Sequence, residues 1–369
     1  MKSFQKYKKK IILFAPSIGD GGVEKNLSII ANYLKDKIDV SILSSNNNKK
    51  KIFNKKINFI CPQTNFFNNK KKFIKSLYSL WLALTKIKNV KLIIAFESNI
   101  FAIIVAKILN LKVIIRSNTS PIGYMNSIFK KFIFSFFFKL ADQVIVNSYE
   151  FKKKIDKELN IKSIVILNPI DNKKTINLKA SKKINDSFFR KEKLILKLIS
   201  IGRLTEQKDF LTLLKSINIL KNKINMKVVI VGKGSEKINL QSYINSNNLS
   251  SIVKLIGYKK NIYPYIQWSD AFILTSKYEG LPNVLLEALS LNKLVISSKC
   301  STGPKEILMN GKVGILFKVG DYKKLSKIIL NYSNKKFLKP KSHLIEKSLK
   351  KYDLKSNCKK YLNIIERFI

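Results

Sequence analysis

Short runs of apolar and β-branched residues alternate with amphipathic stretches along most of the chain. In the first half the apolar runs occupy residues 11–15, 38–43, 57–61, 92–95, 113–115, 144–146 and 164–167. Stretches with a helical spacing of apolar residues lie between them, at 23–34, 73–87 and 128–140. Strands that alternate with helices in this way are typical of βαβ units, so we predict a parallel sheet.

The same pattern begins again after a polar, lysine-rich segment. Predicted strands of the second half are 194–201, 227–231, 253–256, 271–275, 294–298 and 313–317, and predicted helices are 209–220, one that begins near Pro282, and 354–368. We therefore predict an α/β protein with two Rossmann-like, doubly wound domains that face a central cleft. The predicted parts are a first domain at 1–170, a linker at 171–193, a second domain at 194–345, and a C-terminal segment at 346–369 whose helix packs back on the first domain.

The charge of the chain adds a set of candidate partners. The sequence holds 71 Lys+Arg against 23 Asp+Glu, which gives a formal net charge of +48. Such a field attracts nucleic acid, an anionic membrane surface or a phosphate-bearing substrate. A solvated basic surface without a specific partner is equally compatible with the composition, so charge alone does not choose among them.

Cysteine usage and the lengths of the apolar runs favour a cytoplasmic protein that does not cross a membrane. Cys61, Cys300 and Cys358 are widely spaced and the chain has one histidine, so neither a disulfide framework nor a zinc site is expected. The run at 11–15 is too short for a signal peptide and predicts a strand. The run at 92–109 contains charged and polar residues and lacks the uninterrupted apolar length of a spanning helix.

Two glycine-containing turns follow predicted first strands of the two domains. Gly21 and Gly22 precede the helix at 23–34, where backbone N–H groups could approach an anion. A tight turn without a ligand is the other interpretation of this motif.

Gly202 and Arg203 follow the strand at 194–201, and Lys208 lies five residues after Arg203. An arginine fork and a lysine charge at one sheet edge are suited to a diphosphate.

The segment 279–287 combines a helix start with two glutamates. Pro282 suits the first turn of a helix, so free N–H groups are expected near Asn283 and Val284. Glu287 lies below that helix start and could accept hydrogen bonds from ribose hydroxyls, while Glu279 precedes the helix and would meet a sugar. A solvent-exposed glutamate is the other interpretation of Glu287. The turn at 302–304 begins another helix on the same predicted edge.

In this order the motifs resemble those of the retaining GT-B glycosyltransferases of family 4, the glycosyl transferases of group 1. The resemblance rests on Gly202, Arg203 and Lys208, on 231–234 and Gly257, and on 278–287, and it covers nearly the whole second domain. Residues 21–24 and 141–148 extend it into the first domain. Two glutamates with seven residues between them are a specific signal in this setting.

The resemblance implies a role for each matched position. Arg203 and Lys208 would bind the diphosphate, Glu287 the ribose and Glu279 the donor hexose, with Glu279, Arg203 and Lys208 as the catalytic group. The donor-binding set implied by the resemblance is completed by Gly21, Gly22, Gly232, Gly280, Leu281, Asn283 and Val284. It also implies that neither a metal nor a cofactor is needed, because cations and helix N-termini balance the leaving diphosphate.

One departure from the family's pattern concerns the donor sugar. Many members carry a histidine after the strand that corresponds to 113–115, whereas this chain has Arg116 and Asn118 there and its histidine, His343, far along the sequence. We therefore treat Arg116 and Asn118 as candidate sugar or acceptor contacts. Inverting GT-B transferases and epimerases commonly use a histidine base, so its absence from this region favours retention.

These observations predict a retaining glycosyltransferase that moves a hexose or N-acetylhexosamine from a nucleoside-diphosphate sugar, with UDP favoured. The acceptor would be a glycan or a polyprenyl-linked glycan in cell-surface polysaccharide assembly. A basic nucleic-acid- or membrane-binding protein without transferase activity is the alternative. The basic aromatic run at 124–139 is too apolar for a platform that stacks bases, so no nucleic-acid partner is expected.

Lysine clusters in the first domain also predict peripheral attachment to an anionic membrane, on the inner face of the cytoplasmic membrane. The clusters lie at 8–10, 49–51, 55–56, 70–72, 130–131 and 152–154, and the apolar run at 132–138 is close to one of them in sequence.

Overall fold

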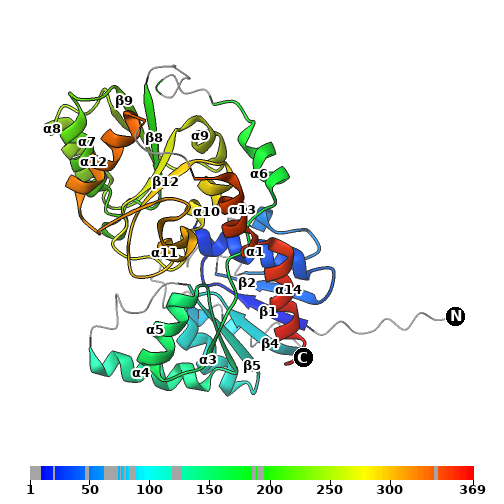
Figure 1. The fold of residues 1–369 in the computed structure, drawn as a ribbon. Helices are drawn as coiled ribbons and strands as arrows, with labels where there is room; N and C mark the ends of the chain where they lie inside the picture. The colour runs from blue at the N-terminus through cyan, green and yellow to red at the C-terminus, as the bar shows by residue number, and fades with distance from the viewer. Residues whose placement is uncertain are drawn as a thin grey trace. The chain divides into compact units, whose positions relative to one another are not determined.

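The structure is a computed structural model that describes residues 10–19, 21–45, 50–61, 74, 76–78, 80–82, 89–118, 127–184, 188, 195–335 and 340–369. The chain divides into two compact units (Figure 1). Unit 1 comprises Met1–Pro169 and Leu354–Ile369, and unit 2 comprises Ile170–Asp353. The lysine clusters at 8–10, 49–51 and 70–72 lie wholly or partly outside the described residues, as does much of the helix predicted at 73–87.

Unit 1 contains a seven-stranded parallel sheet in the order β3-β2-β1-β4-β5-β6-β7. Its strands are β1 (Lys10–Phe14), β2 (Asp39–Leu43), β3 (Asn58–Ile60), β4 (Val90–Ala95), β5 (Lys112–Ser117), β6 (Gln143–Val146) and β7 (Ser163–Val165). The strand order reverses between β1 and β4. In such sheets ligands bind beyond the carboxyl ends of the strands, next to this switch point.

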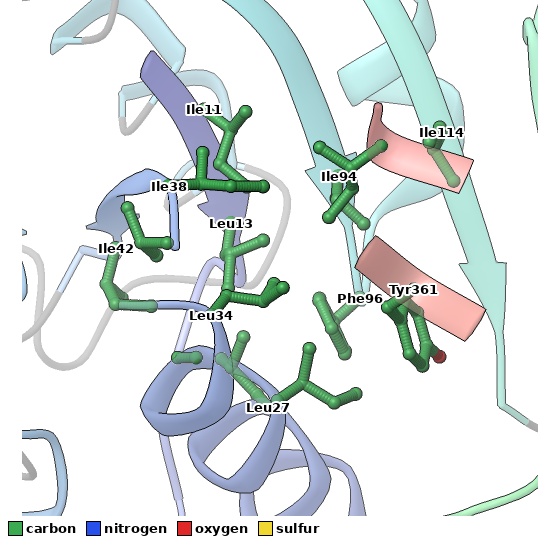
Figure 2. Close-up of a cluster of buried hydrophobic side chains, with 14 of the residues drawn as sticks. Ile11, Leu13, Leu27, Leu34, Ile38, Ile42, Ile94, Phe96, Ile114 and Tyr361 are labelled. Carbon is green, nitrogen blue, oxygen red and sulfur yellow. The ribbon is translucent and has the colours of Figure 1, made fainter. Parts of the chain in front are cut away.

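Helices cover both faces of the unit 1 sheet, which explains why most residues of its strands are apolar. They are α1 (Gly22–Leu34), α3 (Asn99–Ile108), α4 (Ile128–Leu140), α5 (Tyr149–Leu159) and α14 (Leu354–Ile365), with a short 3₁₀ turn at Lys50–Ile52. Successive residues of β1 point to opposite faces. Ile11 and Leu13 pack with α1 and α14 (Figure 2), and Ile12 and Phe14 pack with α3 and α5.

Unit 2 contains a six-stranded parallel sheet in the order β10-β9-β8-β11-β12-β13. Its strands are β8 (Leu196–Ile201), β9 (Met226–Val231), β10 (Val253–Leu255), β11 (Ala271–Leu274), β12 (Leu294–Ser298) and β13 (Ile315–Phe317). Its helices are α6 (Lys173–Ala180), α7 (Phe210–Leu220), α8 (Lys237–Ser246), α9 (Tyr263–Trp268), α10 (Asn283–Ser290), α11 (Pro304–Ile307), α12 (Tyr322–Ser333) and α13 (Ser342–Lys350), with 3₁₀ turns at Glu206–Lys208 and Met309–Gly311.

The predicted fold class is confirmed, because each predicted strand occurs within a few residues of its expected position and both sheets are parallel. The predicted linker at 171–193 is wrong in part, since it contains α6. Asn172 caps this helix by accepting a hydrogen bond from Thr175 N, and Ile176 and Ala180 form its buried face. The Asn261 side chain donates to Lys179 O at 2.7 Å, which fixes α6 within unit 2.

The C-terminal segment is shared between the two units. Residues up to Asp353, with α13, belong to unit 2, whereas α14 belongs to unit 1. Cys358, Tyr361 and Ile365 recur at helical spacing and are buried in the same core as α1, so the chain returns to its first domain at Leu354. None of the helices in the described ranges has the length and apolar character needed to cross a bilayer.

Candidate functional site

The carboxyl ends of three strands of unit 2 meet at glycines. Gly202 N donates to Val231 O at 3.0 Å, and Gly232 N donates to Gly257 O at 3.0 Å. A Cβ on Gly232 would lie 1.8 Å from Gly202 O, so only glycine permits this approach of the two backbones. These turns place Arg203, which directly follows Gly202, at the edge of the sheet.

Arg203 has an exposed side chain that is linked to a more distant loop. Its Nη2 donates to Gln207 Oε1 at 3.3 Å, and Gln207 Nε2 donates to Tyr278 O at 2.9 Å. Lys277 N also donates to Gln207 O at 2.8 Å. Gln207 therefore connects the Arg203 turn to the segment before α10. Sequence reasoning missed Gln207, because a glutamine in a loop carries no pattern that marks such a role.

Lys208 and Glu279 form a nearly buried ion pair at this edge. Lys208 Nζ lies 2.5 Å from Glu279 Oε1, and their side chains are 14% and 7% exposed. The same carboxylate oxygen accepts a hydrogen bond from Ser276 Oγ at 2.6 Å, and Thr275 Oγ1 donates to Lys208 O at 2.9 Å. The structure thus brings together two of the predicted catalytic residues, which lie 71 positions apart in the sequence.

The start of α10 lies next to this pair in the chain. Pro282 precedes the helix, no side chain caps its first turn, and Leu285 N donates to Pro282 O at 3.1 Å. Asn283 and Val284 are half-buried in that turn. Glu287 follows one turn later and is buried, so its interpretation as a solvent-exposed glutamate is wrong.

The turn after β12 fixes the backbone beside Glu279. Thr302 Oγ1 donates to Glu279 O, and Gly303 adopts a φ of +84°. A Cβ on Gly303 would lie 2.1 Å from Gly280 O and 2.9 Å from Pro282 Cδ. The segment that carries Glu279, Gly280 and Leu281 is therefore held by close backbone packing, which requires glycine at position 303.

Cys300 lies near the ion pair, and its thiol is unreactive. Burial raises the pKa of its thiol to about 12, and the Glu279 carboxylate adds to the rise. The thiol is neutral at physiological pH, which does not suit a nucleophile. Among the described residues, no group of three or more histidine, cysteine, aspartate or glutamate side chains could hold a metal ion.

In unit 1, the glycine turn after β1 holds a carboxylate. Gly21 is the N-cap residue of α1 and has no side-chain cap. Glu24 in the first turn accepts a hydrogen bond from Gly19 N at 3.3 Å, and its Oε2 lies 2.6 Å from where a Cβ on Gly21 would be. A phosphate at Gly21 and Gly22 would therefore have to compete with Glu24.

Arg116, a candidate sugar contact, is fully buried in unit 1. Its Nη2 donates to Asn168 Oδ1 at 2.5 Å, its Nη1 donates to Asn118 Oδ1, and its guanidinium lies 5.5 Å from the centre of the Phe96 ring. Burial raises the pKa of Tyr361 in α14, and the Arg116 cation opposes that rise. Figure 2 shows Tyr361 beside Phe96.

This burial does not favour the predicted role of Arg116 as a sugar or acceptor contact, which stays a prediction. Its Nη1 and Nη2 donate to asparagines that follow β5 and β7, whereas its buried Nε has no hydrogen-bond partner among the described residues. Asn118 is half-buried, and its Nδ2 also donates to Phe96 O at 2.6 Å. Asn118 therefore keeps only part of its hydrogen-bonding capacity for a ligand.

Comparisons with known proteins agree with this arrangement. Residues 180–351 match the family model described as glycosyl transferases group 1. An uncharacterized glycosyltransferase of Methanocaldococcus jannaschii is 38% identical over 209 residues, which cover 54% of this chain and 51% of that protein. The chain therefore spans about half the length of this relative.

Two further similarities extend over almost the whole chain. An N-acetylgalactosamine-N,N'-diacetylbacillosaminyl-diphospho-undecaprenol 4-alpha-N-acetylgalactosaminyltransferase of Campylobacter jejuni is 27% identical over 380 residues, covering 96% of this chain and 99% of that protein. The crystal structure of Anabaena HepE in complex with UDP and glucose superposes with a TM-score of 0.78 at 18% identity, covering 97% of this chain and 100% of that one. These matches agree with the resemblance seen in the motifs: residues 180–351 match the glycosyl transferases of group 1, and the fold is that of the GT-B glycosyltransferases.

Proposed function

We propose that this protein transfers a sugar from a nucleoside-diphosphate sugar, with UDP as the favoured nucleotide, to a lipid-linked glycan in polysaccharide assembly. The observation that carries the proposal is the edge of unit 2 at which the Lys208–Glu279 ion pair and the start of α10 lie, with Arg203 exposed nearby. Supporting it, the Campylobacter relative is named for a diphospho-undecaprenol acceptor, and the Anabaena structure holds UDP and glucose.

Each group at this edge has a role that its chemistry suits. Arg203, Lys208 and the N–H groups of Asn283 and Val284 would bind the diphosphate and stabilise the charge that develops on it as the glycosidic bond to phosphate breaks. The buried carboxylate of Glu287 would accept hydrogen bonds from the ribose. Because Glu279 already binds Lys208, the diphosphate would share this lysine with Glu279, which would then face the donor sugar.

We further propose that the transfer retains the anomeric configuration, as in family 4. The bond between the anomeric carbon and the phosphate oxygen would break, and the acceptor oxygen would bond to the same face of the sugar. The acceptor's proton would pass to the leaving phosphate oxygen. This route requires no histidine base, in keeping with Arg116 and Asn118 at the position where many family members have one.

Donor binding should depend on Arg203 and Glu287. Charge-assisted hydrogen bonds contribute about 1.5–3 kcal/mol each, so Arg203→Ala and Glu287→Ala should each weaken UDP-sugar binding by roughly ten- to a hundredfold. The measurement is calorimetric titration, with GDP- and ADP-sugars run in parallel to identify the base. Arg367→Ala removes another exposed arginine, in unit 1, and serves as the matched control. Unchanged affinity in both site variants would remove the site assignment.

Transfer should also persist in excess EDTA. The proposed site balances the diphosphate with Arg203, Lys208 and the α10 N-terminus, so a divalent cation is not needed for charge neutralisation. Initial rates before and after chelation, with product analysis to follow the anomer formed, make this measurement. Loss of activity that manganese restores would contradict metal independence without touching the assignment of the donor site.

Finally, we propose that the protein works at an anionic membrane surface, on its cytoplasmic face, because a lipid-linked acceptor would be presented there.

A further inference from the structure

Helix α4 of unit 1 exposes an unusually large apolar face. Of its 13 residues only Phe138 is buried. The exposed apolar side chains are Ile128 (87% exposed), Phe129 (72%), Phe132 (69%), Phe136 (53%) and Leu140 (39%). At 100° per residue they fall within an arc of about 120°, which we call the apolar face of α4. Contiguous exposed apolar patches of this kind mark sites of interaction with a partner or a membrane.

The opposite side of α4 is firmly attached to unit 1, so the exposure does not result from a loosely packed helix. Phe138 lies in the core with Phe134 and Phe137 packed against it. Ser135 Oγ donates to Leu159 O at 2.6 Å, which ties α4 to α5. Lys131 Nζ lies 2.5 Å from Glu158 of α5. Figure 1 shows α4 beside α5, away from α1 and α14 within this unit.

The charges of α4 indicate what covers its apolar face. The helix contains Lys130, Lys131 and Lys139 and no acidic residue, and Lys139 falls within the arc of the apolar face. A second copy would bring the same lysines against these and would repel them, in a chain of net charge +48. An anionic bilayer is complementary instead, because aromatic rings favour its interface and lysines extend to its head groups.

We propose that the apolar face of α4 inserts into the interfacial region of an anionic bilayer and attaches unit 1 to it. Helices that lie in this plane bury their apolar side by roughly 5–10 Å, while basic residues contact anionic lipids. The inference rests on the proposed function in one respect: a lipid-linked acceptor would explain why a transferase needs this attachment. The face itself is defined by exposure and charge alone.

The test is flotation of the full-length protein with lipid vesicles. Wild-type protein should float with vesicles that contain phosphatidylglycerol and not with pure phosphatidylcholine. Salt at 1 M should release it in large part, because the Debye length falls from about 10 Å at 0.1 M to about 3 Å. Phe132→Ser/Phe136→Ser should reduce partitioning at least tenfold. The matched control is Ile238→Ser on α8, which removes another exposed apolar side chain (80% exposed) from unit 2.

A second measurement reports on insertion. Phe132→Trp should gain fluorescence that brominated lipid quenches, and Ile238→Trp should not. No flotation, equal flotation with both lipids, or undiminished flotation of the Phe132→Ser/Phe136→Ser protein would overturn the proposal. Self-association that this double variant abolishes, in place of flotation, would assign the face to a second copy. UDP binding, measured in solution without vesicles, tests the proposed function separately, so the failure of one is distinguishable from the failure of the other.

Discussion

Replacing Lys208 by methionine should have one of the largest effects on both stability and activity. The substitution leaves the Glu279 carboxylate nearly buried without its cation, and removing one partner of such a pair costs about 3 kcal/mol or more. It also removes a charge proposed to stabilise the leaving diphosphate, which should lower turnover by roughly 100- to 1000-fold. Urea denaturation and initial transfer rates at saturating donor measure the two effects.

A second substitution separates these two consequences. In Lys208→Met/Glu279→Gln, no charge is left unpaired and the glutamine can still accept the Ser276 hydroxyl, so most of the stability should return. Activity should not return, because the cation is still missing. Lys237→Met, at an exposed lysine of α8, is the control. A double variant that regains activity together with stability would show that Lys208 has only a structural role.

The strands could be predicted from the sequence because parallel strands covered on both faces are continuous apolar runs. The run at 294–298 coincides with β12 residue for residue. Helices were harder to predict where neighbouring apolar or lysine residues obscure the helical spacing of the buried positions. The apolar run at 92–109 covers most of β4 and all of α3, which are separated by a three-residue turn that ends at Ser98 in a left-handed conformation. In α6 only Ile176 and Ala180 are buried, and two buried positions among several lysines are too few to predict an amphipathic helix.

The residue types of the candidate site could be predicted, but their pairing could not. Strand order places β8 beside β11, so the loops after both strands share an edge. The sequence does not indicate that Lys208 binds Glu279. Nor does it indicate that the side chains of Gln207 and Thr302 donate hydrogen bonds to the backbone at Tyr278 and Glu279. These contacts depend on backbone positions a few ångströms apart, and side-chain periodicity carries no information at that scale.

Arg116 shows a different limit. The sequence makes it a candidate contact because it follows the strand after which many family members carry a histidine. Its burial depends on Asn168, which follows β7, and on α14, which returns from the far end of the chain. Neither is close to Arg116 in sequence, so its burial could not be predicted from the sequence.

Gly303→Ala is expected to be strongly destabilising, and Gly320→Ala supplies its matched control. Both glycines have positive φ, +84° and +77°, so alanine costs about 1–2 kcal/mol at either position. They differ in their surroundings. A Cβ on Gly320 meets no atom within 4 Å, whereas a Cβ on Gly303 would lie 2.1 Å from Gly280 O.

The difference between the two alanine variants therefore isolates the close packing beside Glu279. To relieve the overlap, the Gly280 backbone or the turn at Thr302 must move, which should add about 1–3 kcal/mol to the loss of stability in Gly303→Ala. The same movement displaces Glu279 from Lys208, so transfer should fall at temperatures where both variants are folded, while Gly320→Ala keeps its activity. Urea denaturation and transfer rates, compared at one temperature, give both quantities. Equal losses of stability, with activity retained in both variants, would mean that the loop at Gly280 adapts freely and that its backbone does not position Glu279.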